Sequence, residues 1–199
     1  MTDKYNSFIY LVARRGLHAP SKHNPHIPAS KYYPVVLMVK ENNGLWGMPG
    51  GKSEQKDLVD ANQKPAIDKA YNTARREFFE EIGRDVALLT KNTCQVTIRD
   101  TQHSKHVCIL FDGWAEHVEK VLNIPHRHVD NVKKSNIRLS NEVAGYAWVS
   151  VNILGTAHKH KNQVLLSSEA HPTDRGMPVK LRGDYVCEPT TIQSILSMC

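Results

Sequence analysis

The sequence predicts an α/β fold, in which helices pack on a β-sheet in layers. Five apolar segments are rich in β-branched or aromatic residues and are bounded by polar or glycine-containing turns, as strands are. One long segment carries apolar residues at the three-and-four spacing of a buried helical face, and a shorter helix is expected near the C-terminus. Because strands and helices interleave along the chain, a layered α/β domain is the expected architecture.

The five predicted strands cover residues 7–13, 34–40, 94–99, 106–115 and 144–151. The long helix is expected to begin near Pro65, since proline suits the first helical position, and to end near Gly83, since glycine suits a C-terminal cap. Its apolar stripe would consist of Ile67, Ala70, Tyr71, Ala74, Phe78 and Ile82. The second helix is expected at 190–198.

The chain has 199 residues, a length that favours a single domain. Three stretches without regular periodicity, at about 16–33, 52–64 and 117–141, are expected to be long loops, and such loops in a compact domain are often functional. No apolar run approaches the roughly 18 residues of a membrane span, and the N-terminal segment has no signal-peptide pattern. We therefore expect a cytoplasmic protein that does not contact membranes.

Charge and cysteine content narrow the classes of partner. The formal net charge is +6 with eleven histidines in addition, which favours anionic partners such as nucleotides, RNA or polyphosphates. Charges that only keep a protein in solution would give the same value. The four cysteines have no paired spacing, which disfavours both a zinc knuckle and a disulfide framework.

Three glutamates are concentrated near the end of the predicted long helix. Glu77, Glu80 and Glu81 stand at positions i, i+3 and i+4, so their side chains share one face at the edge of the apolar stripe. Their mutual repulsion would be relieved by a cation, and carboxylate oxygens in this number suit Mg²⁺ or Mn²⁺. Taken alone, the same pattern is also that of a solvated acidic face.

The surrounding residues resemble the Nudix box, whose form is glycine, five residues, glutamate, seven residues, then Arg-Glu-hydrophobic-x-Glu-Glu-x-Gly-hydrophobic. The segment REFFEEIG, from Arg76 to Gly83, resembles the second half without a gap. Upstream, PGGKSE provides Gly51 as the first glycine and Glu54 as an internal acid, and WGMPGG resembles the usual lead-in. The resemblance implies a Nudix-type α/β/α sandwich with a mixed β-sheet, formed by a single Nudix hydrolase domain at 1–199.

The box departs from the family pattern in its middle. From Gly51 to Arg76 is 76 − 51 = 25 positions where the box has 14, so about eleven residues are inserted in the loop before the helix. The position eight residues before Arg76 holds Asp68 instead of glutamate. Whether Asp68, Glu54 or neither takes the supporting role of that glutamate stays open.

The resemblance also implies a chemistry and a role for each residue. Nudix boxes hold a divalent metal ion and cleave pyrophosphate linkages, commonly in nucleoside diphosphates joined to another group. Glu77 and Glu81 would be the first metal ligands, and Glu80 would be a ligand or the base. The backbone of Gly51 would lie near the ion and the phosphates, and Arg76 would orient the carboxylates.

The loop before the last predicted strand offers a base and a binding surface. Glu142 resembles the acidic residue that supplies the general base in several Nudix relatives, although an exposed loop glutamate is the alternative. The same loop contains Arg127, Lys133, Lys134 and Arg138. We expect these cations to bind substrate phosphates or an RNA backbone, unless they form only a solvated loop.

The sequence thus predicts a Mg²⁺- or Mn²⁺-dependent Nudix pyrophosphohydrolase that acts on an anionic phosphate-containing small molecule or RNA. The basic loop favours a large, highly charged substrate such as capped RNA, a dinucleoside polyphosphate or a diphosphoinositol phosphate. The alternative is a Nudix-fold nucleotide- or RNA-binding module with weak or no catalysis. The insertion and Asp68 suggest this alternative, and the intact set of three glutamates argues against it.

Overall fold

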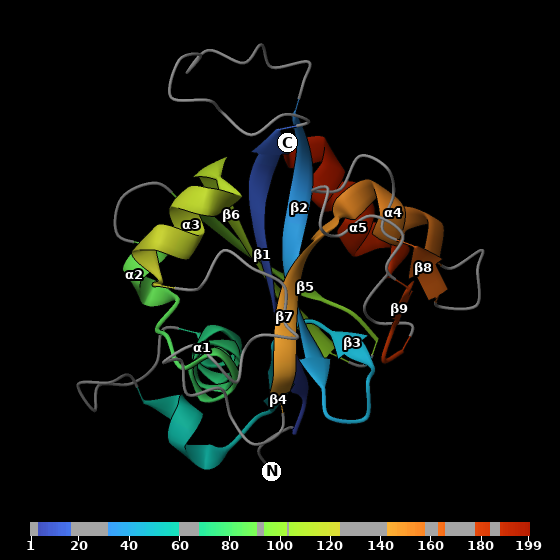
Figure 1. The fold of residues 1–199 in the computed structure, drawn as a ribbon. Helices are drawn as coiled ribbons and strands as arrows, with labels where there is room; N and C mark the ends of the chain where they lie inside the picture. Colours follow the sequence, from blue (N-terminus) through green and yellow to red (C-terminus); the bar gives the residue numbers. More distant parts are fainter. Residues whose placement is uncertain are drawn as a thin grey trace.

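The computed structural model describes residues 4–16, 32–59, 68–90, 94–102, 104–123, 143–157, 163–165, 178–183 and 188–199. The central sheet consists of β1 (Asn6–Gly16), β2 (Tyr32–Glu41), β3 (Trp46–Gly47), β4 (Gly50–Lys52), β5 (Cys94–Asp100), β6 (Ser104–Trp114) and β7 (Val143–Ser150). Its main path runs in the order β3-β2-β1-β6-β5, with β4 paired to β1 and β7 paired to β2 (Figure 1). Strands β1 and β6 are parallel and the other pairs are antiparallel, so the sheet is mixed.

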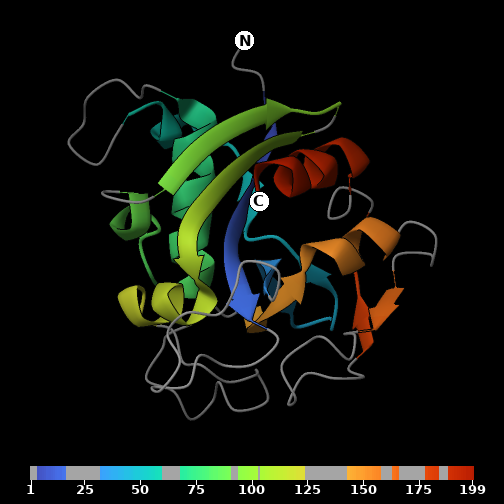
Figure 2. The ribbon, with the colours of Figure 1, turned by 90° about the horizontal axis from the view of Figure 1, so that it is seen from above.

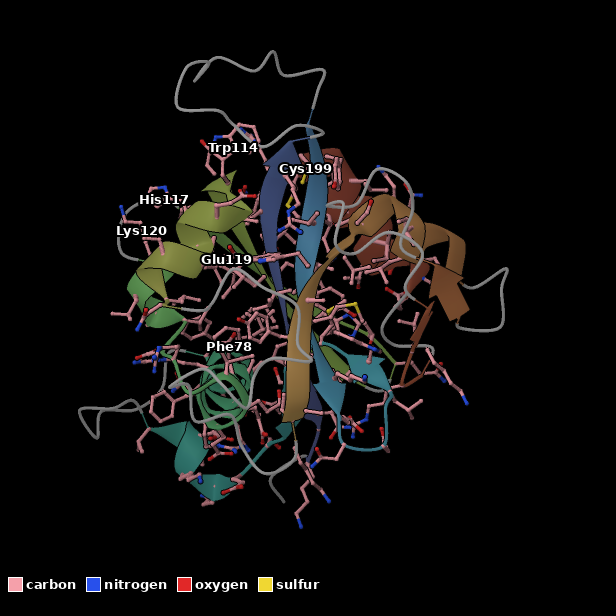
Figure 3. The ribbon with its side chains drawn as sticks, viewed as in Figure 1. Phe78, Trp114, His117, Glu119, Lys120 and Cys199 are labelled. Atoms are coloured by element: carbon pink, nitrogen blue, oxygen red, sulfur yellow. The ribbon has the colours of Figure 1, made fainter. Side chains whose placement is uncertain are left out.

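Helices cover both faces of this sheet (Figures 1 and 2). One face is covered by α1 (Lys69–Ile82), α2 (Ala87–Thr90) and α3 (Ala115–Val121), and the other by α4 (Val151–Ala157) and α5 (Pro189–Met198). Side chains alternate along β1 and divide the core between the two faces. Leu11 belongs to the hydrophobic cluster that also contains Phe78 of α1. The side chain of Phe78 points from α1 toward the sheet (Figure 3). Tyr10 belongs to the cluster that contains Ile192 of α5. The predicted α/β/α sandwich with a mixed sheet is confirmed.

The five predicted strands and the C-terminal helix are all present, with small shifts of their ends. The long helix ends as predicted at Gly83, which closes it in the left-handed conformation with a φ of 73°. The expected start near Pro65 is wrong, since α1 begins at Lys69. The reason is the side chain of Asp68, which caps the helix by accepting two backbone N–H groups of the first turn at 2.7 and 3.2 Å.

The sequence pattern does not predict several short elements. They are β3, β4, a 3-10 helix η2 (Gln55–Leu58), α2, α3, α4 and a separate pair of strands, β8 (Gln163–Leu165) and β9 (Pro178–Lys180). Helix α3 occupies the beginning of the loop expected at 117–141, and η2 lies within the one expected at 52–64. Most of the rest of the three expected loops, residues 17–31, 60–64 and 124–141, lies outside the described residues.

Within the described parts of the chain, no helix has both the length and the apolar character needed to cross a membrane.

Candidate active site

Gly50 and Gly51, which we call the glycine turn, begin strand β4 and lie against the first strand of the sheet. Strands β1 and β4 pair so that Gly50 lies opposite Phe8 and Gly51 opposite Ser7. Gly50 has a φ of 151°, and a Cβ atom there would lie 2.3 Å from the carbonyl oxygen of Ser7, so the position requires glycine. The backbone N–H of Gly50 donates to Oε2 of Glu81 on α1 at 3.1 Å. The turn therefore brings backbone into direct contact with the carboxylate helix.

Two carboxylates of α1 lie against this turn. Glu81 accepts the Gly50 N–H, and a Cβ atom on Gly51 would lie 2.6 Å from the carboxylate carbon of Glu77. Burial raises the pKa of Glu81 to about 8, an effect that the hydrogen bond from Gly50 opposes and the charge of Glu77 increases. Burial also raises the pKa of Glu77, although Arg76 lowers it. Two carboxylates held close together with little solvent are a favourable setting for a cation, which would offset the cost of ionising both.

Arg76 contacts most of the neighbouring acidic groups. Its Nε donates to Oδ1 of Asp57 at 2.9 Å, and its Nη1 lies 2.8 Å from Oε1 of Glu77 and 3.0 Å from Oε2 of Glu80. Its Nη2 donates to the carbonyl oxygen of Lys52 at 2.9 Å. Burial alone would lower the pKa of Arg76, but the contacts with Asp57 and Glu77 raise it above its usual value. The side chain is only 14% exposed, so its donors are used within the protein.

Asp57 is the buried partner of Arg76, and the sequence analysis did not select it. Its side chain is 2% exposed and accepts hydrogen bonds from Thr73 Oγ1 and from the backbone N–H of Glu54, both at 2.8 Å. Burial alone would raise the pKa of Asp57, but the bonds from Arg76, Glu54 and Thr73 together lower it. Asp57 is therefore an ionised carboxylate that anchors Arg76.

The spacing from the box glycine contains the signal that identifies Asp57. Five residues separate Gly51 from Asp57, which is the spacing of the family's glutamate, whereas counting back from Arg76 leads to Asp68. The structure gives Asp68 a different task, the capping of α1. The insertion therefore lies after Asp57, between η2 and α1, and Asp57 takes the supporting position.

Glu80 and Glu54 lie at the exposed edge of this cluster. The half-exposed Glu80 lies 3.7 Å from Lys56 Nζ in addition to its contact with Arg76. Glu54, also half-exposed, lies 3.1 Å from Lys56 Nζ and 3.6 Å from Arg76 Nη1. Both carboxylates are thus paired with cations of the protein, unlike Glu81, whose hydrogen bond comes from the backbone.

The other predicted site residues lie outside the described residues. They are Glu142, Arg127, Lys133, Lys134 and Arg138. The description resumes at Val143, which pairs with Glu41 at the end of β2. Further along β7, Nε1 of Trp148 donates at 2.8 Å to Glu119, a buried residue of α3 (Figure 3). The strand that follows Glu142 is therefore fixed to both the sheet and α3.

The glycine turn provides oxygen donors of the kind that Mg²⁺ and Mn²⁺ prefer. Among the described residues, no three His, Cys, Asp or Glu side chains form a group that could hold a metal ion. The donors at the turn are two carboxylates, Glu77 and Glu81. Because Mg²⁺ is commonly held by one or two carboxylates and keeps its other positions for water and substrate phosphate, this donor set fits the ion.

Comparison with known proteins decides the family. The family model of the NUDIX domain matches residues 28–167, well over half of the chain. The chain belongs to the Nudix family. No curated protein matches it.

Several solved structures are similar to this Nudix chain. They include a C. elegans Ap4A hydrolase, with 12% identity, a TM-score of 0.36 and coverage of 74% of this chain and 80% of that one. A Nudix hydrolase from Nitrosomonas europaea has 11% identity and a TM-score of 0.40, with coverage of 96% and 89%. Shewanella oneidensis NrtR has 14% identity and a TM-score of 0.41, with coverage of 98% of this chain and 64% of that one.

The last position of the Nudix box departs from the pattern for a structural reason. Arg84 occupies the final hydrophobic position, and its Nε donates to the carbonyl oxygen of Leu122 at 2.8 Å. Leu122 follows directly on α3 and is buried. The substitution thus connects the end of the Nudix helix to α3.

Proposed function

We propose that this Nudix protein is a divalent-metal-dependent pyrophosphohydrolase that cleaves the diphosphate linkage of a nucleoside diphosphate derivative or similar polyphosphate. The observation that carries the proposal is the contact of Glu77 and Glu81 with the Gly50–Gly51 turn, where both carboxylates have a raised pKa. A pyrophosphate carries concentrated negative charge, so these carboxylates would repel it unless a cation lay between them.

Glu77, Glu81 and the backbone oxygen of Gly51 would hold Mg²⁺ or Mn²⁺. When bound, such an ion neutralises charge on the attacked phosphate and activates or orients water. The protein's own part is to keep the two carboxylates together at low exposure, with Arg76 holding Glu77 at 2.8 Å. Since the pKa of Glu81 is about 8, most of this carboxyl is protonated at neutral pH, and cation binding has to release the proton.

Glu80 and Glu142 are the candidates for the general base. Glu80 already accepts a hydrogen bond from Arg76 at 3.0 Å and lies 3.7 Å from Lys56 Nζ, so both of its oxygens are engaged by cations of the protein. This pairing supports Glu142, which immediately precedes β7. In this proposal Glu142 accepts the proton of the attacking water, and Arg76 and Glu80 act as positioning groups.

The basic segment before Glu142 would bind the distal anionic part of the substrate. It contributes Arg127, Lys133, Lys134 and Arg138. Charge-assisted contacts from such residues suit additional phosphates or an RNA backbone. Capped RNA, a dinucleoside polyphosphate and a diphosphoinositol phosphate are therefore the substrates to test first.

A Nudix-fold binding module without catalysis is the second candidate. The pairing of Glu80 with both Arg76 and Lys56, together with the insertion after Asp57, favours it. Such a module would bind a nucleotide or RNA and release no product.

A substrate panel separates the two candidates. The three substrate classes and simple nucleoside diphosphate derivatives are incubated with Mg²⁺ or Mn²⁺, and released phosphate or mononucleotide is measured. The proposal expects metal-dependent release from at least one compound and none in excess EDTA. Tight binding without release from any compound would instead support the binding module, and activity that persists in EDTA would contradict metal dependence.

A further inference from the structure

The segment at 178–183 lies beyond the part of the chain that the NUDIX model matches, and it packs back on that part. After β9, Leu181 forms a parallel bridge with Trp46 of β3 and is buried in the core. The backbone N–H of Arg182 donates to the carbonyl oxygen of Trp46 at 2.7 Å. The backbone of Arg182 is therefore fixed beside β3. Two residues separate the end of strand β3 from Gly50, the first residue of the glycine turn.

The side chain of Arg182 pairs with Glu41. Nη1 of Arg182 lies 2.6 Å from Oε1 of Glu41, and the two side chains are 46% and 21% exposed. The other oxygen of Glu41 accepts from Nδ2 of Asn43 at 2.9 Å, so the carboxylate is held by the turn between β2 and β3. Within the described residues, the guanidinium of Arg182 makes no further hydrogen bond or ion pair. Arg182 thus uses one of its nitrogens for Glu41, and the described residues leave the other N–H donors to a ligand.

Arg182 and Glu41 belong to the electrostatic surroundings of Glu81. Burial is the main cause of the raised pKa of Glu81, but the positive charge of Arg182 lowers this pKa and the negative charge of Glu41 raises it. The geometry agrees, because the backbone of Arg182 is hydrogen-bonded to Trp46 of β3. Gly50, whose N–H donates to Glu81, follows β3 after two residues.

Arg76 and Arg182 differ in solvent exposure and in how many of their N–H donors are already used. Arg76 is 14% exposed, and each of its three nitrogen atoms already contacts an oxygen of the protein. Arg182 is nearly half exposed and uses one nitrogen for Glu41. A planar guanidinium with unused donors binds phosphate oxygens in bidentate geometry, which makes Arg182 the better suited of the two.

We propose that Arg182 binds a phosphate group of the substrate beside Glu81. This inference rests on the proposed hydrolase function and extends it with a residue from outside the matched Nudix region. Glu41 keeps its contact with Nη1 and acts as a positioning residue, while the remaining donors of Arg182 hold phosphate oxygens. The C-terminal segment thereby contributes directly to substrate binding.

The test compares Arg182→Ala with Glu41→Gln and with a matched control, Arg14→Ala. Arg14 is a comparably exposed arginine that pairs with Asp112 at 3.1 Å, far along β1 from the glycine turn. Binding of the non-hydrolysable analogue α,β-methylene-ADP is measured by calorimetry with Mg²⁺ present. KM and kcat are measured with the best substrate of the panel, and Tm is measured for each variant.

Loss of Arg182 should weaken binding of the analogue and raise KM at least about tenfold, the scale of one charge-assisted hydrogen bond. Since this contact would hold ground state and transition state alike, kcat should change less. Glu41→Gln should keep or tighten binding, because Arg182 stays and its competing carboxylate charge is removed. Arg14→Ala should bind like the wild type.

A purely structural ion pair gives a different result. Arg182→Ala and Glu41→Gln would then lower Tm to a similar degree and leave the affinity within twofold of the wild type, which overturns the proposal. Should Arg182→Ala fail to fold, Arg182→Lys is tested in its place. Because lysine lacks the guanidinium group, wild-type affinity of Arg182→Lys for the analogue would also overturn the proposal. A wild type that binds the analogue but hydrolyses nothing contradicts the hydrolase function, and the affinities alone then decide on Arg182.

Discussion

Asp57 and Arg76 form an ion pair that joins the two halves of the Nudix box. Arg76 donates from Nε to Oδ1 of Asp57 at 2.9 Å and from Nη2 to Oδ2 at 3.3 Å. The inserted residues of the box lie between these two positions. Because the same guanidinium contacts Glu77 and Glu80, the ion pair also orients the carboxylates of the site. The longer loop therefore leaves this arrangement of the box intact.

Asp57→Asn tests this ion pair by removing its negative charge. We expect a loss of about 3 kcal/mol in the free energy of unfolding at pH 7, because Arg76 would remain buried without its main counter-charge. The pKa of Asp57 is lowered in the folded protein from its ordinary value of 3.8, so its stabilisation is complete above that value and is lost as the pH falls through the folded pKa. Denaturant unfolding at a series of pH values measures both effects.

Asp68→Ala is the control for this measurement. Asp68 caps α1, and loss of a cap costs about 1 kcal/mol without changing the carboxylates of the site. We expect kcat to stay near the wild-type value in this variant and to fall in Asp57→Asn. A kcat that falls in Asp68→Ala and stays near the wild-type value in Asp57→Asn would assign the supporting role to Asp68 instead.

Gly51→Ala tests the contact between the glycine turn and the carboxylate helix. The added Cβ atom would lie 2.6 Å from the carboxylate of Glu77, so the carboxylate has to move. A misplacement of about 1 Å in a catalytic site costs about a hundredfold in rate, and we expect kcat to fall on that scale. Circular dichroism checks that the variant is folded. A folded variant with wild-type kcat would remove Gly51 and Glu77 from the mechanism.

Mg²⁺ binding should release a proton from Glu81. With a pKa of about 8, this carboxyl is mostly protonated at pH 7, and the bound cation requires the charged form. Calorimetry in buffers of different ionisation enthalpy should show release of close to one proton per ion at pH 7. The apparent affinity should rise with pH and level off above about 8. Binding without proton release would contradict the proposal that Mg²⁺ binds a protonated Glu81.

The basic loop can be tested by reversing Lys133 and Lys134 together to Glu. If this loop binds the distal part of the substrate, KM should rise well beyond the few-fold effect of one exposed contact, and its dependence on salt should weaken. The rate at saturating substrate should change little, because these groups would bind ground state and transition state alike. Equal KM values and equal salt dependence in both proteins would leave the loop as a solvated surface.

The sequence predicts the sheet and the two longer helices because their apolar patterns are periodic over many residues. Helix α3 is missed because it has seven residues, and its buried Ala115 and Val118 alternate with charged side chains. Strands β3 and β4 have only two and three residues and exist through pairing with distant strands. Periodicity within one segment cannot report such pairing.

Some residues of the site can also be predicted from the sequence, whereas others cannot. Helical spacing alone places Glu77 and Glu81 on one face, and the count from Gly51 could have identified Asp57. Arg182 has no such signal, because only the packing of Leu181 on β3 brings it near Glu41 and Glu81. Groups that reach a site through tertiary contacts require the structure.

The most direct test of the proposed function is the turnover of the best panel substrate by the wild type and by Glu81→Gln at saturating Mg²⁺. The substitution keeps the size of the side chain and removes the charge that the cation needs. We predict that kcat falls by at least about a hundredfold, the scale on which a lost catalytic group acts, while the variant unfolds as cooperatively as the wild type. Wild-type turnover in a folded Glu81→Gln protein would contradict the assignment of the metal-dependent site to the glycine turn and the Nudix helix.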